Sequence, residues 1–371
     1  MIDRVTGRRD RGRVTLPVRL RRRLLLSATA ASGLVVVGCS GGDEDDPAGS
    51  GASAPGDSPT PTPSTAAPVM GASQVLLPDP TGAGVLLLTG PPEGAADDGP
   101  LLPWRWDGEA WTQLPSDMAP GARSFFAATY DPARKVVVLF GGDPSTGETW
   151  EWDGRRWRGL DVPGPDGVMS ASLAYDPATG VVTLYGGNEQ EGDVHGETWS
   201  WDGAQWGMIA GRGPEPIRWP AAMVADAVGH ALVLYGGHQV VDPDLPAALA
   251  DTWVWADARW TSRPNAAGPG RLVNAQALDH PQLGTLLLGG SDLEQATGDV
   301  WHWDGDRWLP MAQGVFPARQ AFGLAYDAAR DVVVLTGGLV EPGSPQRHQD
   351  LWEWSGDPND RAVQVDAREP A

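Results

Sequence analysis

The sequence has little of what stabilises or activates many exported proteins. Its 371 residues include one cysteine, Cys39, so an intrachain disulfide is excluded and stability has to come from burial of apolar side chains. The six histidines are scattered without metal-ligand spacing, and no Gly-x-Ser-x-Gly nucleophile motif occurs. We therefore predict no catalytic residue, no metal ligand and no cofactor.

Positive charge is also scarce. The formal net charge is −21, although the first 38 residues carry nine arginines and two aspartates, a charge of +7. Without that leader the chain has a charge of −28. Such an acidic body argues against nucleic acid as a partner, because binding of nucleic acid needs a basic surface.

The N-terminal segment has the pattern of an export signal. Basic residues precede the apolar run 24–37, which is too short and too rich in Ala, Ser and Gly for a stable membrane span. The sequence Val-Val-Gly-Cys ending at Cys39 resembles the bacterial lipobox, in which the cysteine is acylated. The sequence therefore predicts a lipoprotein signal peptide at 1–38 and a lipid anchor on the outer face of the bacterial cytoplasmic membrane. The route is open: general export, or twin-arginine export, which Arg21-Arg22-Arg23 resembles.

Residues 39–68 contain almost nothing apolar and consist mainly of Asp, Gly, Ser, Pro, Thr and Ala. Such a segment cannot offset the entropy of ordering, so we expect a flexible tether. The acidic residues just after Cys39 would be repelled by anionic headgroups. The tether then holds the following domain off the membrane.

The rest of the chain is a repeat. An apolar run ends in Gly-Gly, a polar loop follows, and an acid, a Trp-x-Trp pair, a tight turn and a last Trp complete the unit. Seventeen of the 18 tryptophans occupy these positions. The Trp-x-Trp pairs are Trp104/Trp106, Trp150/Trp152, Trp199/Trp201, Trp253/Trp255, Trp301/Trp303 and Trp352/Trp354.

Each unit is predicted to form four short strands, here called a to d. In the second unit these are Ser124 to Tyr130, Val136 to Phe140, Thr149 to Trp152, and a strand starting at Trp157. Nothing in the repeat has helical period. A period near 50 residues with this strand content predicts a propeller.

The Gly-Gly after an apolar strand, the Tyr-Asp before it and the downstream Trp pair resemble the Kelch repeat of galactose-oxidase-type propellers. The resemblance implies an all-β, six-bladed propeller of four antiparallel strands per blade over 69–358. The first unit departs from it, because Thr89-Gly90 replaces Gly-Gly. The copper chemistry of galactose oxidase is not implied, since it needs a Tyr–Cys crosslink. The tail 359–371 lacks a closing Trp, and we expect it to supply the last strand of blade six.

One face of the disc should carry function. The a-to-b and c-to-d turns are short everywhere, whereas the b-to-c loops on the other face are long and varied, which is typical of binding loops on a rigid scaffold. The b-to-c loops are 143–148, 188–197, 238–251, 291–299 and 339–350 in blades two to six. The longest belongs to blade four and begins at His238.

Two residue types recur on that face. Seven residues before the Tyr position of strand a stands an arginine in four blades, and an acid precedes strand c in five. The arginines are Arg123, Arg218, Arg271 and Arg319, and the acids are Glu148, Glu197, Asp251, Asp299 and Asp350. Two interpretations are open: the pairs close the channel mouth as structure, or the arginines await an anionic ligand.

Blade four offers the sharpest candidate site. Trp219 is the tryptophan outside the repeat and follows Arg218, beside the long loop that starts at His238. Tryptophan and arginine are the residue types most enriched where binding energy concentrates. We predict ligand binding by Arg123, Arg218, Trp219, His238, Arg271 and Arg319, with an acidic sugar or a peptide carboxylate as the fitting ligand.

Two classes of function remain. We favour a non-catalytic module that binds an unidentified protein, peptide or carbohydrate, or serves as a scaffold. The alternative is an enzyme acting on a sugar or sugar acid at the channel mouth. Fully paired rings of arginines and acids would favour the first, and a carboxylate in a polar pocket without an arginine would favour the second.

The lipid anchor yields the first prediction. Cys39→Ala should move the protein from the membrane fraction to the soluble fraction, because the acylated thiol is the expected membrane attachment. Fractionation followed by immunoblotting measures this, and unchanged membrane retention of the variant would contradict it.

Overall fold

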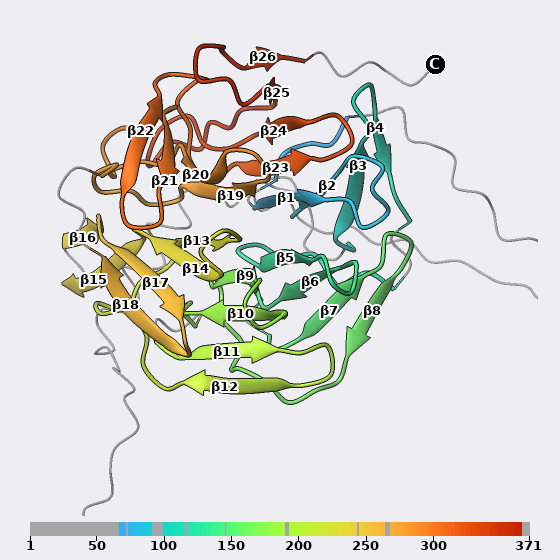
Figure 1. Cartoon of the computed structure of the whole chain (residues 1–371). Coiled ribbons are helices and arrows are strands. Elements are labelled where there is room, and N and C mark those ends of the chain that lie inside the picture. Colours follow the sequence, from blue (N-terminus) through green and yellow to red (C-terminus); the bar gives the residue numbers. More distant parts are fainter. Residues whose placement is uncertain are drawn as a thin grey trace, which may run out of the picture.

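The protein is a ring of six four-stranded antiparallel sheets, a six-bladed β-propeller, which confirms the predicted fold class (Figure 1). The computed structural model describes residues 67–365, except 72, 91–98, 116–117, 145, 190–192, 243–244 and 264–267. The predicted signal peptide, Cys39 and nearly all of the tether lie outside the described residues. Within the described part, no helix is long and apolar enough to cross a membrane.

The strands follow the chain blade by blade, from the innermost outwards. Blades one to three are β1 (Gln74–Pro78), β2 (Val85–Thr89), β3 (Leu102–Trp106), β4 (Trp111–Gln113); β5 (Ala127–Asp131), β6 (Val136–Phe140), β7 (Thr149–Trp152), β8 (Trp157–Leu160); β9 (Ser172–Asp176), β10 (Val181–Tyr185), β11 (Thr198–Trp201), β12 (Trp206–Ala210). Blades four to six are β13 (Ala222–Asp226), β14 (Ala231–Tyr235), β17 (Thr252–Ala256), β18 (Arg259–Arg263); β19 (Gln276–His280), β20 (Gly284–Leu288), β21 (Val300–Trp303), β22 (Trp308–Ala312); β23 (Gly323–Asp327), β24 (Val332–Thr336), β25 (Leu351–Trp354), β26 (Val363–Gln364). Blade four also carries a separate hairpin, β15 (His238–Asp242) and β16 (Leu245–Ala248).

The first strands β1, β5, β9, β13, β19 and β23 pack against one another around the centre of the ring (Figure 1). The second strand of each blade is its most buried element, and in β2 and β14 every residue is buried. An unbroken apolar run suits a strand that is covered on both faces. Blade one forms a complete sheet even though it lacks the Gly-Gly pair.

The hydrophobic core lies between the blades. The second Trp of the c strand packs on the Trp that opens the d strand, with ring centroids 5.3–5.5 Å apart in blades one to five. Side chains of neighbouring blades join one cluster, as where Leu86 and Leu88 of blade one meet Val137 and Trp152 of blade two. Fully burying each tryptophan stabilises the fold by at least about 2–3 kcal/mol.

Blades one and six meet without an inserted strand from the part of the N-terminal segment that the structure describes. β26, from the C-terminal tail, is the outermost strand of blade six and pairs with β25. Trp104 and Leu87 of blade one share a core cluster with Val334 and Leu351 of blade six. The side-chain amide of Gln74 also donates to the Ala321 carbonyl at 3.1 Å. Packing and side-chain hydrogen bonds therefore close the ring.

The Gly-Gly pairs allow the backbone of one blade to approach the next. Gly141 and Gly142 have φ of +67° and +106°, and the Gly142 amide donates to the Val168 carbonyl at 2.9 Å. A Cβ at Gly141 would lie 2.2 Å from that carbonyl oxygen. A side chain here is excluded both by conformation and by space.

We expect Gly141→Ala to destabilise the fold by more than about 2 kcal/mol, from backbone strain and the clash with Val168. Gly211→Ala is the matched control, because a Cβ there meets nothing within 4 Å. Thermal unfolding followed by tryptophan fluorescence compares the two, and equal melting temperatures would refute the account.

Candidate functional site

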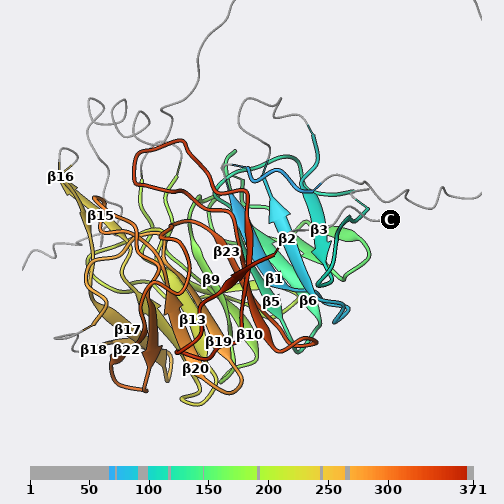
Figure 2. The same cartoon turned by 90° about the horizontal axis from the view of Figure 1, so that it is seen from above.

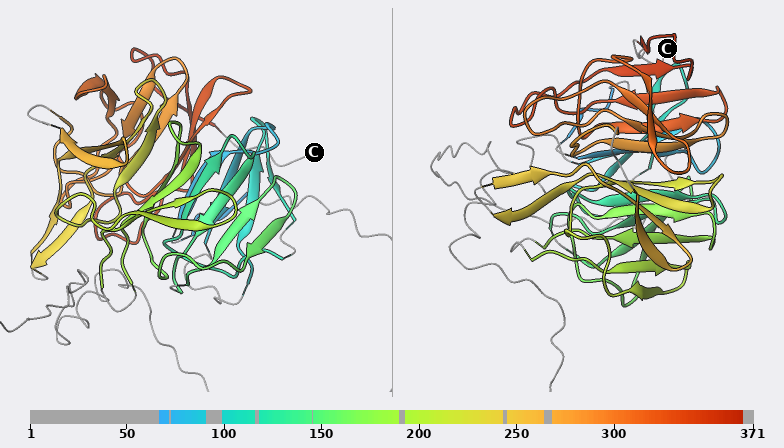
Figure 3. Two further views of the ribbon diagram at one scale, coloured as in Figure 1. Left: turned by 60° about the horizontal axis from the view of Figure 1, so that its bottom comes forward. Right: turned by 60° about the vertical axis from the view of Figure 1, so that its left-hand side comes forward.

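The long connections gather on one face of the disc, which we call the loop face: the b-to-c loops and the d-to-a connections (Figure 2). The opposite face carries tight turns capped by carboxylates, as where Asp131 accepts hydrogen bonds from the amides of Ala133 and Arg134. The β15–β16 hairpin projects from the ring (Figure 3). Candidate residues concentrate on the loop face.

Three of the four recurrent arginines are buried and paired. Arg218 and Arg319 have no exposed side-chain surface, and each guanidinium forms a two-pronged ion pair, with Asp251 and Asp350 respectively. Arg123 bonds Glu148 at 2.9 Å. Each also donates to a backbone carbonyl just before it and to the first glycine of its blade's Gly-Gly pair. These contacts match the structural interpretation, in which the guanidinium donors are engaged by acceptors of the protein itself.

The same three acids accept a hydrogen bond from the first Trp of the following strand. The indole donors are Trp150, Trp253 and Trp352, at 3.2, 2.7 and 2.7 Å. Burial would raise the pKa of Asp251, but the hydrogen bonds and charge of Arg218 outweigh burial and hold that pKa below its usual range. An arginine, an acid and a tryptophan thus form a tie, the Arg–acid–Trp tie, in blades two, four and six.

Blade three has no such tie, because Val168 stands where the arginine would be. Its acid, Glu197, instead lies 3.5 Å from Nδ1 of His195, whose Nε2 is 3.0 Å from Glu189. Burial alone would lower the pKa of His195, but the two carboxylates outweigh it and raise the pKa. Glu197 is a carboxylate that no arginine binds within the described part of the chain, the feature expected of the enzyme alternative.

In blade five the position predicted for the recurrent arginine is wrong by one residue. His280 takes the place of the turn-capping aspartate: its Nδ1 accepts from the amides of Gln282 and Leu283. Counting back from His280 puts buried Leu272, and not Arg271, at the arginine position, and the Leu272 carbonyl accepts from Gly237 as Val168 does from Gly142. Arg271 is exposed and makes no ion pair with a described residue. The residue of blade five equivalent to Trp219 is Val273, whose backbone bridge to Ser291 corresponds to that between Trp219 and His238.

Three of the predicted residues gather at the base of the β15–β16 hairpin. Trp219 and His238 exchange backbone hydrogen bonds of 3.0 and 3.2 Å, and their rings are 6.1 Å apart in an edge-on arrangement. The segment that holds Arg271 lies beside them, since Leu272 bonds the backbone of both Gly237 and Leu249. We call Trp219, His238 and Arg271 the hairpin-base patch.

The patch combines an aromatic ring, a histidine and a cation. Trp219 and His238 are half-buried, and Arg271 is exposed. Burial lowers the pKa of His238, so its ring is neutral at pH 7. Its Nε2 is buried and is hydrogen-bonded by no residue that the structure describes. A buried polar atom of this kind calls for a partner.

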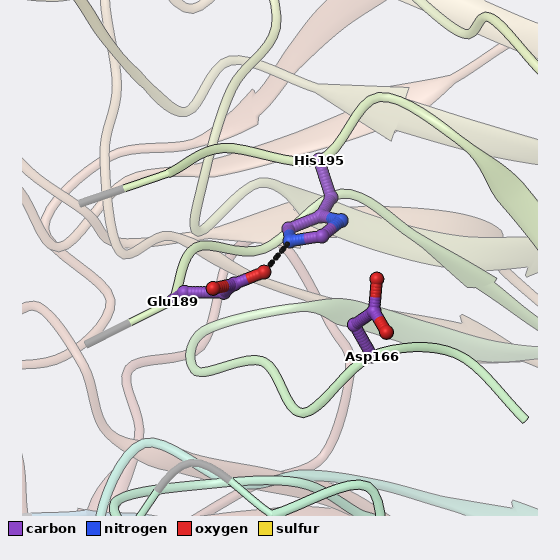
Figure 4. A group of neighbouring side chains, drawn as sticks. All are labelled: Asp166, Glu189 and His195. Carbon is purple, nitrogen blue, oxygen red and sulfur yellow. Dashed lines mark hydrogen bonds and ion pairs between the residues drawn. The ribbon is translucent and has the colours of Figure 1, made fainter. Parts of the chain in front are cut away.

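A second group in blade three was not predicted. Asp166, Glu189 and His195 bring a ligand atom each within 4.8 Å of one another (Figure 4). Glu189 and His195 flank one b-to-c loop, whereas Asp166 comes from the d-to-a connection before β9. The sequence signal was the pairing of Glu189 with His195 in a single loop, but nothing in the sequence linked Asp166 to them.

Comparison with known proteins supports the fold alone. No protein-family model matches the chain, and no curated protein matches its sequence. Among solved structures, that of a protein named YjhT superposes with a TM-score of 0.57 at 15% identity, covering 81% of this chain and 98% of that one. The chain is therefore similar to YjhT in architecture.

We expect Arg218→Ala to lower the free energy of unfolding by about 2 kcal/mol or more, because it leaves Asp251 without its partner. A fully buried pair would lose roughly 3–5 kcal/mol, and the 34% exposure of the Asp251 side chain reduces this through solvent screening. Arg212→Ala, which removes an exposed arginine from the same connection, is the control. Denaturant unfolding measures both, and an Arg218→Ala variant as stable as the control would show that the tie is not structural.

Proposed function

We propose that the chain is a non-catalytic binding protein, a Kelch-type propeller that holds an anionic ligand at the hairpin-base patch. The observation that carries the proposal is the exposure of Arg271 on the segment whose backbone pairs with the base of the hairpin, while Arg123, Arg218 and Arg319 are buried in pairs. An exposed guanidinium can form two parallel hydrogen bonds with a carboxylate. The ligand class is an acidic sugar or a peptide carboxylate.

The three residues have separate tasks. Arg271 recognises the carboxylate, Trp219 provides an apolar surface for a sugar ring or a peptide side chain, and His238 packs edge-on against the Trp219 ring and orients it. Arg123, Arg218 and Arg319 support the loops and do not touch the ligand. The protein is exported and anchored through Cys39, so that this capture takes place outside the cytoplasmic membrane.

The second candidate is an enzyme acting on a sugar or sugar acid. One observation favours it: His195 lies between two carboxylates of blade three, Glu189 and Glu197, with no arginine in the group. A histidine whose pKa is raised by carboxylates can exchange protons near neutral pH. The binding proposal requires that a bound ligand is recovered unchanged.

Matched acidic and neutral probes test the proposed function. Calorimetric titration uses two pairs, glucuronate with glucose and a tripeptide acid with its amide. We expect the acid of at least one pair to bind more tightly, and Arg271→Ala to reduce that preference about tenfold or more, because a charged hydrogen bond contributes about 1.5–3 kcal/mol. Trp219→Ala should weaken both members of the pair.

Arg212→Ala is the matched control and should keep the preference, since it removes an exposed arginine elsewhere on the loop face. The proposal fails if the wild-type protein shows no preference for either acid, or if Arg271→Ala retains it. Nuclear magnetic resonance of the same mixtures distinguishes the two functions, because any conversion of the sugar would favour the enzyme.

A further inference from the structure

We propose that Asp166, Glu189 and His195 bind one divalent transition-metal cation of the zinc class. The three offer one nitrogen and two carboxylate oxygens, all within 4.8 Å of one another. Zinc takes histidine nitrogen and carboxylate oxygen at roughly 2.0–2.2 Å, which separates tetrahedral ligand atoms by roughly 3.3 Å. Nε2 of His195 and Oε1 of Glu189 are already 3.0 Å apart, close to that separation.

The ring of His195 has the kind of hydrogen-bonding partner that orients metal-bound histidines. Its second nitrogen, Nδ1, faces Glu197 at 3.5 Å, outside the group of three. A metal-bound histidine almost always directs its other ring nitrogen at such a partner, which fixes the ring and raises its basicity. Glu197 is itself held by the Gly196 amide at 3.2 Å.

Comparison among the blades explains why this arrangement occurs in blade three. The counterparts of Glu197 in blades two, four and six, namely Glu148, Asp251 and Asp350, are bound by arginines. Val168 replaces the arginine in blade three, so Glu197 turns to His195 instead. The site therefore depends on one substitution within the repeat.

Backbone hydrogen bonds hold Glu189 and His195 in place within their loop. The Glu189 amide donates to Asp193 at 2.8 Å and the His195 amide to Gly187 at 3.0 Å, which holds the two ends of the loop together. Three protein donors leave a fourth tetrahedral position for water or for a ligand oxygen. Because one donor is imidazole, zinc or nickel fits better than magnesium or calcium, which prefer oxygen alone.

Zinc titration of the full chain tests the site. The protein carries no affinity tag and has Cys39→Ala, which removes its thiol, and 150 mM salt suppresses weak binding to the acidic surface. Competition with a chromophoric chelator should show one zinc ion per chain, not displaced by magnesium or calcium at equal concentration. Zinc should also raise the melting temperature, because it binds the folded state.

Variants separate a metal site from a simple ion pair. His195→Gln should weaken zinc binding at least 100-fold and abolish the zinc-dependent rise in melting temperature. Glu197→Gln should weaken it about tenfold while one ion per chain still binds, as expected of a positioning residue. His348→Gln is the control, because His348 also lies near a carboxylate, Asp350 at 3.6 Å, which Arg319 already binds.

The proposal is overturned if the wild-type chain takes up no zinc, if His195→Gln binds it as tightly as the wild type, or if His348→Gln loses it equally. A lower melting temperature of His195→Gln without any effect of zinc on the wild type would identify the group as an ion pair only.

Discussion

The structure depends on burial of tryptophan between neighbouring blades. Each d-strand Trp in blades three to five packs on its own c strand and donates its indole hydrogen to a threonine of the preceding blade: Trp206 to Thr149, Trp260 to Thr198, and Trp308 to Thr252, at 2.8–3.2 Å. A single blade cannot bury both of its faces, so each depends on its neighbours. With no disulfide available, the closed ring is the source of stability, and it leaves the loops to differ from one blade to the next.

The Arg–acid–Trp tie explains where chemically available groups are found on the loop face. In blades two, four and six the arginine and the acid satisfy each other, and their loops are held in place. In blades three and five the arginine position is apolar, Val168 and Leu272. Those are the places where His195 gathers carboxylates and where Arg271 is exposed. Both proposed sites thus include residues of a blade that lacks the arginine of the Arg–acid–Trp tie.

The two proposed sites involve adjacent blades and are proposed to bind ligands of opposite charge. The blade-three group presents carboxylates to a cation, and the hairpin-base patch presents a guanidinium to an anion. The connection that carries Arg218 passes over Gly186 of blade three, where a Cβ would lie 2.9 Å from the Arg218 carbonyl. The connection that carries the arginine of the blade-four tie therefore contacts blade three as well as its own blade.

The sequence by itself determined the six repeats and the four strands in each, because these follow from local period, turn residues and apolar runs. It also indicated the loop face, since loop length is visible in the chain. Only the tertiary structure decided which arginines are buried in pairs, because pairing depends on side-chain directions at the channel mouth. The one-residue shift at Arg271 is visible only in the structure, because the sequence offers Asp279 as the turn-capping residue, whereas His280 is the residue that caps the turn. Asp166 joined Glu189 and His195 only in three dimensions, since two separate loops bring them together.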